Sequence, residues 1–218
     1  MLPETLPVCP VRGSVIYPTM VMPIDAGRPV SIRAIDEALT RERVLLIVSQ
    51  RDKEVENPKP SDLYEVGTAC NILKMRKNPD GSVQVLVQAF ARVRVKEWLD
   101  LGDHLEAKGE VLSDEPADST LIKALVREVK DKFQALLKEG KYLVPEVAQF
   151  VLNLEDPSQL ADYIAFHMDF RLEDKQRVLE TSNVAERLKR VLVLLEAELE
   201  LIETQRRIQQ QVKEEIDR

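Results

Sequence analysis

Cysteine and histidine are scarce in this sequence of 218 residues, which contains two of each. So few thiols exclude the disulfide-rich scaffolds of small secreted domains. We expect Cys9 and Cys70 to be separate buried thiols, while a single pairing between them stays open. The histidines, His104 and His167, have no second ligand at the spacing of a metal site, so we expect structural or surface roles for both.

Glycine is also rare, and the seven glycines form neither of the common phosphate-binding patterns. The Walker A pattern and the glycine-rich dinucleotide pattern are both missing, which excludes the usual nucleotide-binding loops. Adjacent carboxylates such as Asp36 and Glu37, or Asp114 and Glu115, are typical of solvated surface charge. We therefore predict no catalytic residues, no cofactor and no metal site in this chain.

An excess of positive charge is lacking too, since 31 lysines and arginines face 38 acidic residues, for a net charge of −7. This balance argues against a nucleic-acid platform, which needs clustered cations. The longest apolar runs fall far short of the roughly 20 residues that span a membrane, and the N-terminus lacks the features of a signal peptide. We expect a soluble, cytoplasmic protein with neither a membrane nor a nucleic-acid partner.

Proline, by contrast, is concentrated near the start of the chain. Residues 6–28 carry Pro7, Pro10, Pro18 and Pro23 among alternating apolar residues, and a helical pattern follows. Proline has no N–H to donate to a sheet ladder, so we expect the strands that carry these prolines to lie at a sheet edge or beside a bulge.

The proline-rich segment resembles the start of the N-terminal domain of the bacterial Lon proteases, a family of ATP-dependent AAA+ proteases. The residues that match the family order are Leu6, Pro7, Pro10, Arg12, Val15, Pro18, Met20, Pro23, Gly27, Arg28 and Ser31. Further family segments continue in order at residues 63–67, 72–75, 79–81, 85–91, 145–147, 156–162, 165–168, 174–176 and 184–188. One departure is Gly13-Ser14, where the family usually has an acidic residue followed by an aliphatic one.

Apolar periodicity divides the chain into two halves. Residues 6–112 form short alternating or β-branched runs, with one helix beginning at Pro29 and one turn ending at Gly81. Beyond a polar linker at residues 113–118 the period becomes helical. We predict helices from about residue 121 to Gly140, and over residues 145–152, 157–168, 173–180 and 183–218.

Together with the resemblance, this pattern predicts an α+β fold. It consists of a PUA-like curled antiparallel β-domain with one helix, then a helical bundle that ends in a long extended helix. We place the domains at residues 1–115, 116–182 and 183–218. The last helix has no cap before Arg218, and we interpret it as the start of the coiled-coil linker that leads to the ATPase module in the family.

The resemblance implies a non-catalytic domain for substrate recognition and tethering. Such a domain binds unfolded or damaged proteins through exposed apolar surface, for ATP-dependent degradation in protein quality control. In the family, ATP and Mg²⁺ bind to a separate ATPase module, and a Ser–Lys peptidase completes a homohexameric serine endopeptidase. The alternative is a stand-alone adaptor or regulatory module that resembles the Lon N-terminal domain. An RNA-binding module is disfavoured by the acidic balance.

Two apolar surfaces are candidates for substrate binding. The first follows the proline-rich segment and consists of Tyr17, Pro18, Met20, Met22 and Met75, with Phe90 as a further candidate. Met20, Met22 and Ile24 share one face of a strand at period two, and methionine adapts to many partner shapes. The alternative, that this face fills the core of the β-domain, stays open. The second candidate is the loop Tyr142, Leu143 and Val144, for which packing inside the helical half is the alternative.

The apolar stripe of the last helix becomes sparse toward its end. Its later members are Ile202, Ile208, Val212 and Ile216, which lie among glutamines and charged residues. A helix that extends beyond its own core is either solvated or covered by a partner. We predict that this stripe supports weak self-association, so that the chain by itself is a monomer or a weak dimer.

Overall fold

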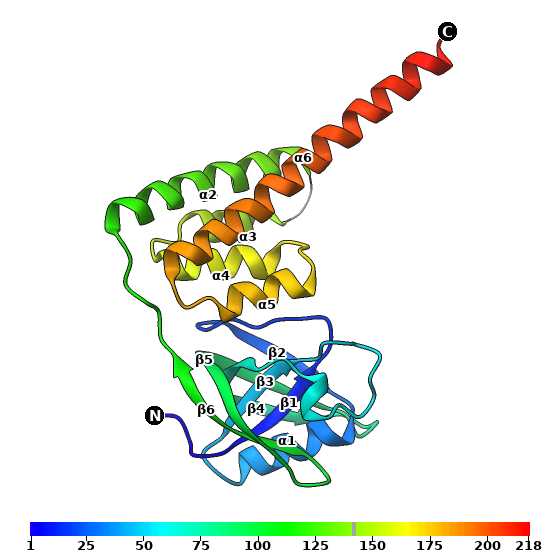
Figure 1. Cartoon of the computed structure of the whole chain (residues 1–218). Helices are drawn as coiled ribbons and strands as arrows, with labels where there is room; N and C mark the ends of the chain where they lie inside the picture. The colour runs from blue at the N-terminus through cyan, green and yellow to red at the C-terminus, as the bar shows by residue number, and fades with distance from the viewer. Residues whose placement is uncertain (141–142) are drawn as a thin grey trace. The chain divides into compact units, whose positions relative to one another are not determined.

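The computed structural model describes residues 1–140 and 143–218. Two compact units divide the chain: Met1–Ser113 with Arg171–Ser182, and Asp114–Phe170 with Asn183–Arg218. Figure 1 shows the strands and helices that make up each unit. None of the helices in the described ranges is both long enough and apolar enough to cross a membrane.

The first unit is built on one six-stranded mixed sheet with the order β2-β5-β4-β3-β1-β6. Its strands are β1 (Leu6–Val11), β2 (Val21–Ala26), β3 (Val44–Ser49), β4 (Val66–Lys77), β5 (Val83–Asp100) and β6 (Leu105–Leu112). Strands β1 and β3 run parallel and every other pairing is antiparallel. Strand β5 is long enough to pair with β2 through its first half and with β6 through its second, which curls the sheet on itself.

The α+β fold predicted from the sequence is confirmed, with one change in the strands. Instead of short runs only, the sheet contains one strand of 18 residues, β5, which extends from Val83 to Asp100. Two irregularities in the β4–β5 pairing, with Phe90 as the extra residue on β5 and Leu73 as the extra residue on β4, let the sheet bend without interrupting either strand.

The prolines of β1 and β2 avoid the need for a backbone N–H donor in two different ways. Pro23 lies in β2, which pairs with β5 alone among the strands of the described residues. Pro7 and Pro10 lie in β1, which has neighbours on both sides in the sheet order. The expectation that these two prolines lie in an edge strand is therefore wrong. Because β6 pairs with residues 6–8 of β1 and β3 with residues 8–11, each proline has a neighbour on one side only.

Two apolar clusters fill the first unit. One lies between the sheet and helix α1 (Pro29–Leu39) and includes Ile24, Ile35 and Ile47. The other includes Leu6, Leu46 and Val93 on the opposite side of β3. Every residue of β3 is buried because the strand faces a cluster on each side.

Both cysteines are buried free thiols, as expected. Burial raises the pKa of Cys9 to about 11, and it raises the pKa of Cys70 as well. Both thiols therefore stay protonated at neutral pH and behave as small apolar side chains.

Helix α5 (Leu172–Glu180) belongs to the first unit, although the predicted domain boundaries place it in the helical bundle. Gln176 Nε2 donates to the carbonyl oxygen of Val66 at 2.9 Å, and Arg92 Nε donates to that of Leu179 at 2.9 Å. These long-range hydrogen bonds join α5 to β4 and β5. Helical periodicity marks such an element as a helix but does not indicate which core it packs against.

The second unit contains the remaining helices. They are α2 (Ser119–Glu139), α3 (Pro145–Leu152), α4 (Pro157–His167) and α6 (Val184–Ile216). The side chains of Asp118, Asp156 and Asn183 accept hydrogen bonds from backbone N–H groups in the first turns of α2, α4 and α6. Helix α6 packs along α2 and α4.

A buried arginine stabilises the start of α6. Arg187 is 0% exposed, and its Nη2 lies 2.7 Å from Asp114 Oδ1. Its Nη1 lies 3.7 Å from Oδ1 of Asp162, a residue that is 2% exposed. The ion pairs therefore link the segment before α2 and helix α4 to α6 within the same unit.

Candidate protein-binding surface

Strand β2 turns its methionine face inward. Met20 and Ile24 are 4% and 8% exposed, and Met22 and Met75 are half-buried against the core next to α1. Tyr17 is fully buried, and its hydroxyl donates to the carbonyl oxygen of Lys175 at 2.7 Å.

The surface predicted around Tyr17 and Met20 is therefore wrong for those two residues. Of that set, Pro18 is half-buried, like the methionines at the edge of the core. The alternative, in which this face fills the β-domain, is what the structure shows. Period two separates two faces of a strand, but burial depends on which face the rest of the chain covers.

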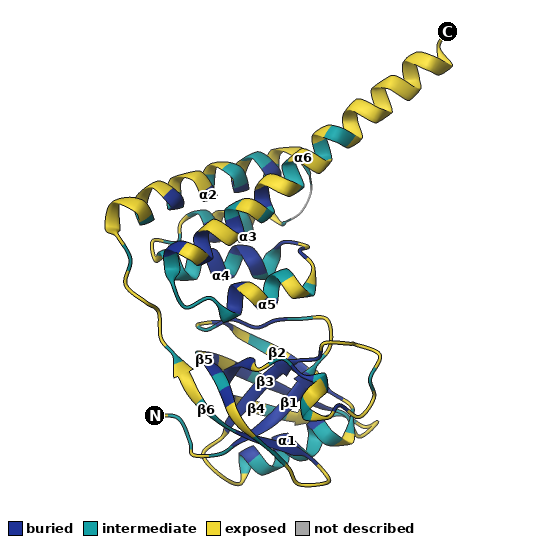
Figure 2. Cartoon of the chain, in the orientation of Figure 1, coloured by how far each residue is buried: buried dark blue, intermediate teal, exposed yellow. Residues whose placement is uncertain are grey.

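The opposite face of the same strands carries exposed apolar side chains. Val21 is 54% exposed, Leu73 43% and Phe90 38%. Pro23 is exposed and Leu86, its partner across the β2–β5 pairing, is half-buried. We call these five residues the outer-face patch. Figure 2 shows the mixture of buried and exposed segments along these strands.

Register accounts for the outward position of Leu73. Its neighbour Ile72 is buried and pairs with Val87, whereas Lys74 pairs with Leu86. Leu73 is thus an extra residue on β4, inserted between the inward Ile72 and the inward Met75. Both Leu73 and Lys74 consequently face outward, and an apolar side chain is added to the surface beside Leu86.

The basic residues Lys74, Arg76 and Lys77 continue the same stretch of β4. All three are exposed. Arg76 pairs with Gln84, which shares the outer face with Leu86 two residues further along β5. Lys74 and Arg76 therefore give the outer face a basic end beside its apolar part, whereas Lys77 lies opposite the buried Val83.

Sequence reasoning missed most of the outer-face patch. Only Phe90 was named as a candidate, and the structure leaves it partly exposed. The available signal was the alternation itself, because Val21 and Pro23 fall between Met20, Met22 and Ile24 and so must face the other way.

The second predicted surface is described only in part. Tyr142 lies outside the described residues, Leu143 is half-buried, and Val144 is 58% exposed just before α3. On α3 itself, Phe150 is 50% exposed, and its ring packs edge-on against Tyr163 at a centroid distance of 5.3 Å. A binding role for this loop stays a prediction.

The stripe on α6 also stays a prediction. Ile202 is half-buried, and the exposed fractions of Ile208, Val212 and Ile216 are 53%, 49% and 77%. The buried positions of this helix end at Leu195, so the later turns lie beyond the packed part of the second unit (Figure 2).

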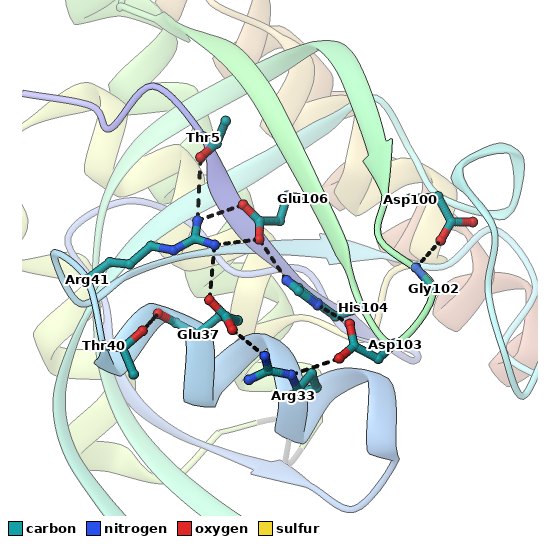
Figure 3. Close-up of polar contacts among 10 residues, drawn as sticks. All are labelled: Thr5, Arg33, Glu37, Thr40, Arg41, Asp100, Gly102, Asp103, His104 and Glu106. Carbon is teal, nitrogen blue, oxygen red and sulfur yellow. Dashed lines mark hydrogen bonds and ion pairs between the residues drawn. The ribbon is translucent and has the colours of Figure 1, made fainter.

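A network of charged residues joins α1 to β6, and no motif in the sequence pointed to it. Glu106, whose side chain is 3% exposed, accepts hydrogen bonds from Arg41 at 2.6 and 2.8 Å and lies 2.7 Å from His104 Nε2. Figure 3 shows how the network continues through His104 to Asp103 and Arg33. His104 Nδ1 lies 2.6 Å from Asp103 Oδ1, and Arg33 Nε donates to Asp103 Oδ2 at 2.9 Å.

This network lies beside a cavity of about 710 Å³ lined by Pro29, Arg33, Lys59, Asp103, His104 and Leu105, among others. The charged groups of the network are partners of one another, and they connect the helix to the sheet. Hydrogen bonds from Arg41 hold the pKa of Glu106 below its ordinary value, with a further lowering by His104, although burial opposes the shift. The network therefore contributes stability while Glu106 is ionised.

We expect Glu106→Gln to destabilise the first unit by about 2 kcal/mol near neutral pH. Because the pKa of Glu106 is lowered in the folded state, its stabilising effect is complete above the unfolded pKa of about 4.3 and is lost as the pH falls further. Urea unfolding followed by the fluorescence of Trp98, at pH values between about 3 and 7, measures the effect.

The difference in the free energy of unfolding between the wild type and Glu106→Gln should shrink as the pH falls below about 4. Glu110→Gln is the matched control, because Glu110 is 55% exposed and pairs with Lys96 on the surface. A difference between wild type and Glu106→Gln that stays constant with pH would contradict the role assigned to Glu106.

The comparisons with known proteins agree with this structure. Residues 5–197 match the family described as the ATP-dependent protease La (LON) substrate-binding domain. Over all 218 residues the chain is 89% identical to Lon protease 2 of Thermus thermophilus, of which it covers 27%. It is 38% identical to the Lon protease of Escherichia coli over 213 residues, which are 98% of this chain and 27% of that protein. The chain thus spans about a quarter of the length of these relatives.

A solved structure with a similar fold is the N-terminal domain of the Mycobacterium avium complex Lon protease. It has a TM-score of 0.72 and 27% sequence identity, and the match covers 88% of this chain and 98% of that one. The Lon N-terminal domain protein from Xanthomonas campestris, at 13% identity, shares the fold with a TM-score of 0.58 over 87% of this chain and 97% of its own. The resemblance identified in the proline-rich segment is confirmed, because the matched family is described as the substrate-binding domain of the Lon proteases. This chain belongs to the family of Lon substrate-binding domains.

Proposed function

We propose that this chain captures unfolded or damaged proteins through the outer-face patch and tethers them for degradation by an ATP-dependent Lon-like protease in the bacterial cytoplasm. The observation that carries the proposal is the group of exposed apolar side chains on one face of β2, β4 and β5. Misfolded proteins differ from native ones chiefly in the apolar surface that they display, so an apolar patch selects them by the hydrophobic effect.

The composition of the patch suits weak contacts with apolar segments of many different client proteins. Val21, Leu73 and Phe90 each expose a large fraction of an apolar side chain, but each is also anchored in a paired strand. A fixed surface loses little conformational entropy when a flexible client binds to it. Removing such side chains from water contributes about 25 cal/mol per Å² of apolar area, so a patch of this kind binds a client segment only weakly.

Several copies of the domain in one assembly would hold an unfolded client more tightly than a single copy does. In a homohexameric parent protease, an unfolded chain that touches one patch is held at high effective concentration near the others. Native proteins display few apolar segments and would engage one patch at most. Selectivity for unfolded clients would therefore exceed the affinity difference at any single patch.

We expect the double variant Val21→Ser/Leu73→Ser to bind an unfolded client about tenfold more weakly than the wild type. Both side chains are about half exposed, so their replacement removes contact area with little loss of core packing. The probe is labelled α-lactalbumin, once reduced with its thiols blocked by neutral amide groups and once native with bound calcium. Fluorescence anisotropy measures the dissociation constant of each form.

The matched control is Val193→Ser, which removes an apolar side chain that is 63% exposed on α6. It should bind the unfolded probe as the wild type does. If the wild type binds the native and unfolded probes equally, or binds neither, the proposed capture of unfolded proteins is wrong. If binding persists in the double variant, the contact lies outside the outer-face patch.

A further inference from the structure

Three cations, Lys74, Arg76 and Lys77, cluster within four residues at the end of β4. Lys74, Arg76 and Lys77 are exposed, and they have no ion-pair or hydrogen-bond partner among the residues that the structure describes. Other exposed cations either lie against a carboxylate, as Lys96, Lys189 and Arg206 do, or are spread along a helix, as Arg190, Arg207 and Lys213 are on α6. Unpaired positive charge in one place is notable in a chain of net charge −7.

Two of these cations, Lys74 and Arg76, are continuous with the outer-face patch. Lys74 follows Leu73 directly and lies opposite Leu86 in the β4–β5 pairing, and Arg76 lies opposite Gln84. From Leu73 to Arg76 the strand advances by about 10 Å, which is the length of three extended residues. An extended segment bound over Leu73 and Leu86 would therefore reach the cations within about three residues.

Two carboxylates near this end of the sheet accept hydrogen bonds from neutral groups. Asp25 lies on β2 and accepts a hydrogen bond from Gln84 Nε2 at 3.1 Å. Asp80 lies in the turn after β4 and accepts hydrogen bonds from the backbone N–H and the hydroxyl of Ser82 at 2.9 and 2.6 Å. Both carboxylates keep their negative charge, but among the described residues neither forms an ion pair with a cation of β4, and the three cations are exposed.

We propose that the outer face selects client segments in which an apolar block is adjacent to acidic residues. The inference rests on the proposed capture of unfolded proteins and adds its substrate class. Apolar side chains of the client would pack on Val21, Leu73 and Phe90, and its carboxylates would pair with Lys74 and Arg76. Charge complementarity at the edge of an apolar contact contributes specificity and association rate more than affinity.

A protein segment fits this surface better than a nucleic acid does. Nucleic-acid binding needs a broad basic surface, and single strands in addition stack their bases on aromatic side chains. Here the cations border aliphatic side chains, Phe90 is the one aromatic residue of the patch, and the chain as a whole is acidic.

The test uses three labelled peptides with the same apolar block of valine, leucine and phenylalanine. The block is followed by three acidic residues in the first peptide, three serines in the second and three lysines in the third. Fluorescence anisotropy on the whole 218-residue chain gives each dissociation constant at low and at high salt. We expect the acidic peptide to bind about fivefold more tightly than the serine peptide, and the lysine peptide most weakly. The differences should shrink in high salt, which screens exposed charges.

The variant Lys74→Gln/Arg76→Gln should lose the preference for the acidic peptide and keep the affinity for the serine peptide. Both side chains are exposed, so the fold does not depend on them. The matched control is Arg207→Gln/Lys213→Gln, which removes two exposed cations from α6 and should keep the preference.

Equal binding of the acidic and serine peptides would overturn this inference and leave the capture of unfolded proteins intact. Binding of none of the three peptides would overturn both. A single-stranded oligothymidylate that displaces the acidic peptide from the wild type, but does not bind Lys74→Gln/Arg76→Gln, would show that the cations serve a polyanion and would also overturn the inference.

Discussion

Replacing Arg187 with alanine is expected to destabilise the helical unit by about 3 kcal/mol. The side chain is fully buried and lies 2.7 Å from an Asp114 oxygen and 3.7 Å from the buried Asp162. The substitution leaves the buried carboxylate of Asp162 without this cationic neighbour, and it also leaves a cavity. Urea unfolding followed by far-ultraviolet circular dichroism, which reports mainly on helices, measures the change.

Two further variants separate charge from volume. Arg187→Met keeps much of the volume and removes the charge, so its cost reports the lost ion pairs. Arg190→Ala removes an exposed arginine from the same helix and should change stability by less than about 0.5 kcal/mol. If Arg187→Ala is no more destabilising than Arg190→Ala, the buried ion pairs contribute nothing to the unit.

Replacing Gly67 with alanine is expected to destabilise the β-rich unit by about 3 kcal/mol. A Cβ atom at this position would lie 2.5 Å from the carbonyl oxygen of Ile47 and 2.7 Å from Cγ2 of Val48. A backbone oxygen in a paired strand cannot move aside without disturbing the β3–β4 ladder, so the clash is costly. The fluorescence of Trp98, the single tryptophan of the chain, follows unfolding of this unit.

The matched control is Gly27→Ala, since no described atom lies within 4 Å of a Cβ built there. That substitution should leave the unfolding midpoint within the error of the measurement or raise it slightly, because alanine restricts the unfolded chain. Similar midpoints for Gly67→Ala and Gly27→Ala would show that the sheet adapts to the added methyl group.

The sequence of β2 predicts two distinct faces of the strand but does not determine which of them is exposed. Alternation along residues 20–26 predicts two distinct faces, and the structure has both. The prediction chose the face with the methionines, whereas the outward face carries Val21 and Pro23. Methionine suits an adaptable binding surface, but it fills an irregular core equally well, so residue type could not decide between the faces.

Helix α5 was predicted as a helix and assigned to the wrong neighbours for a similar reason. Its own sequence contains the periodicity and the acidic first turn, which are local signals. Its attachment to the first unit depends on hydrogen bonds such as that from Gln176 to Val66, which is 110 residues away. Contacts at such separations leave no periodic trace in the sequence.

The sequence by itself determined the family, through the order of the proline-rich motif, and the helices, through their apolar stripes and the capping residues Asp118, Asp156 and Asn183. These features depend on residues close together in the chain. Only the tertiary structure decided that Met20 lies inside and Val21 outside, that Leu73 is an extra outward residue, and that Arg187 pairs with Asp114. Each of these depends on segments that meet only in the folded chain, because burial and register are set by packing and not by local preference.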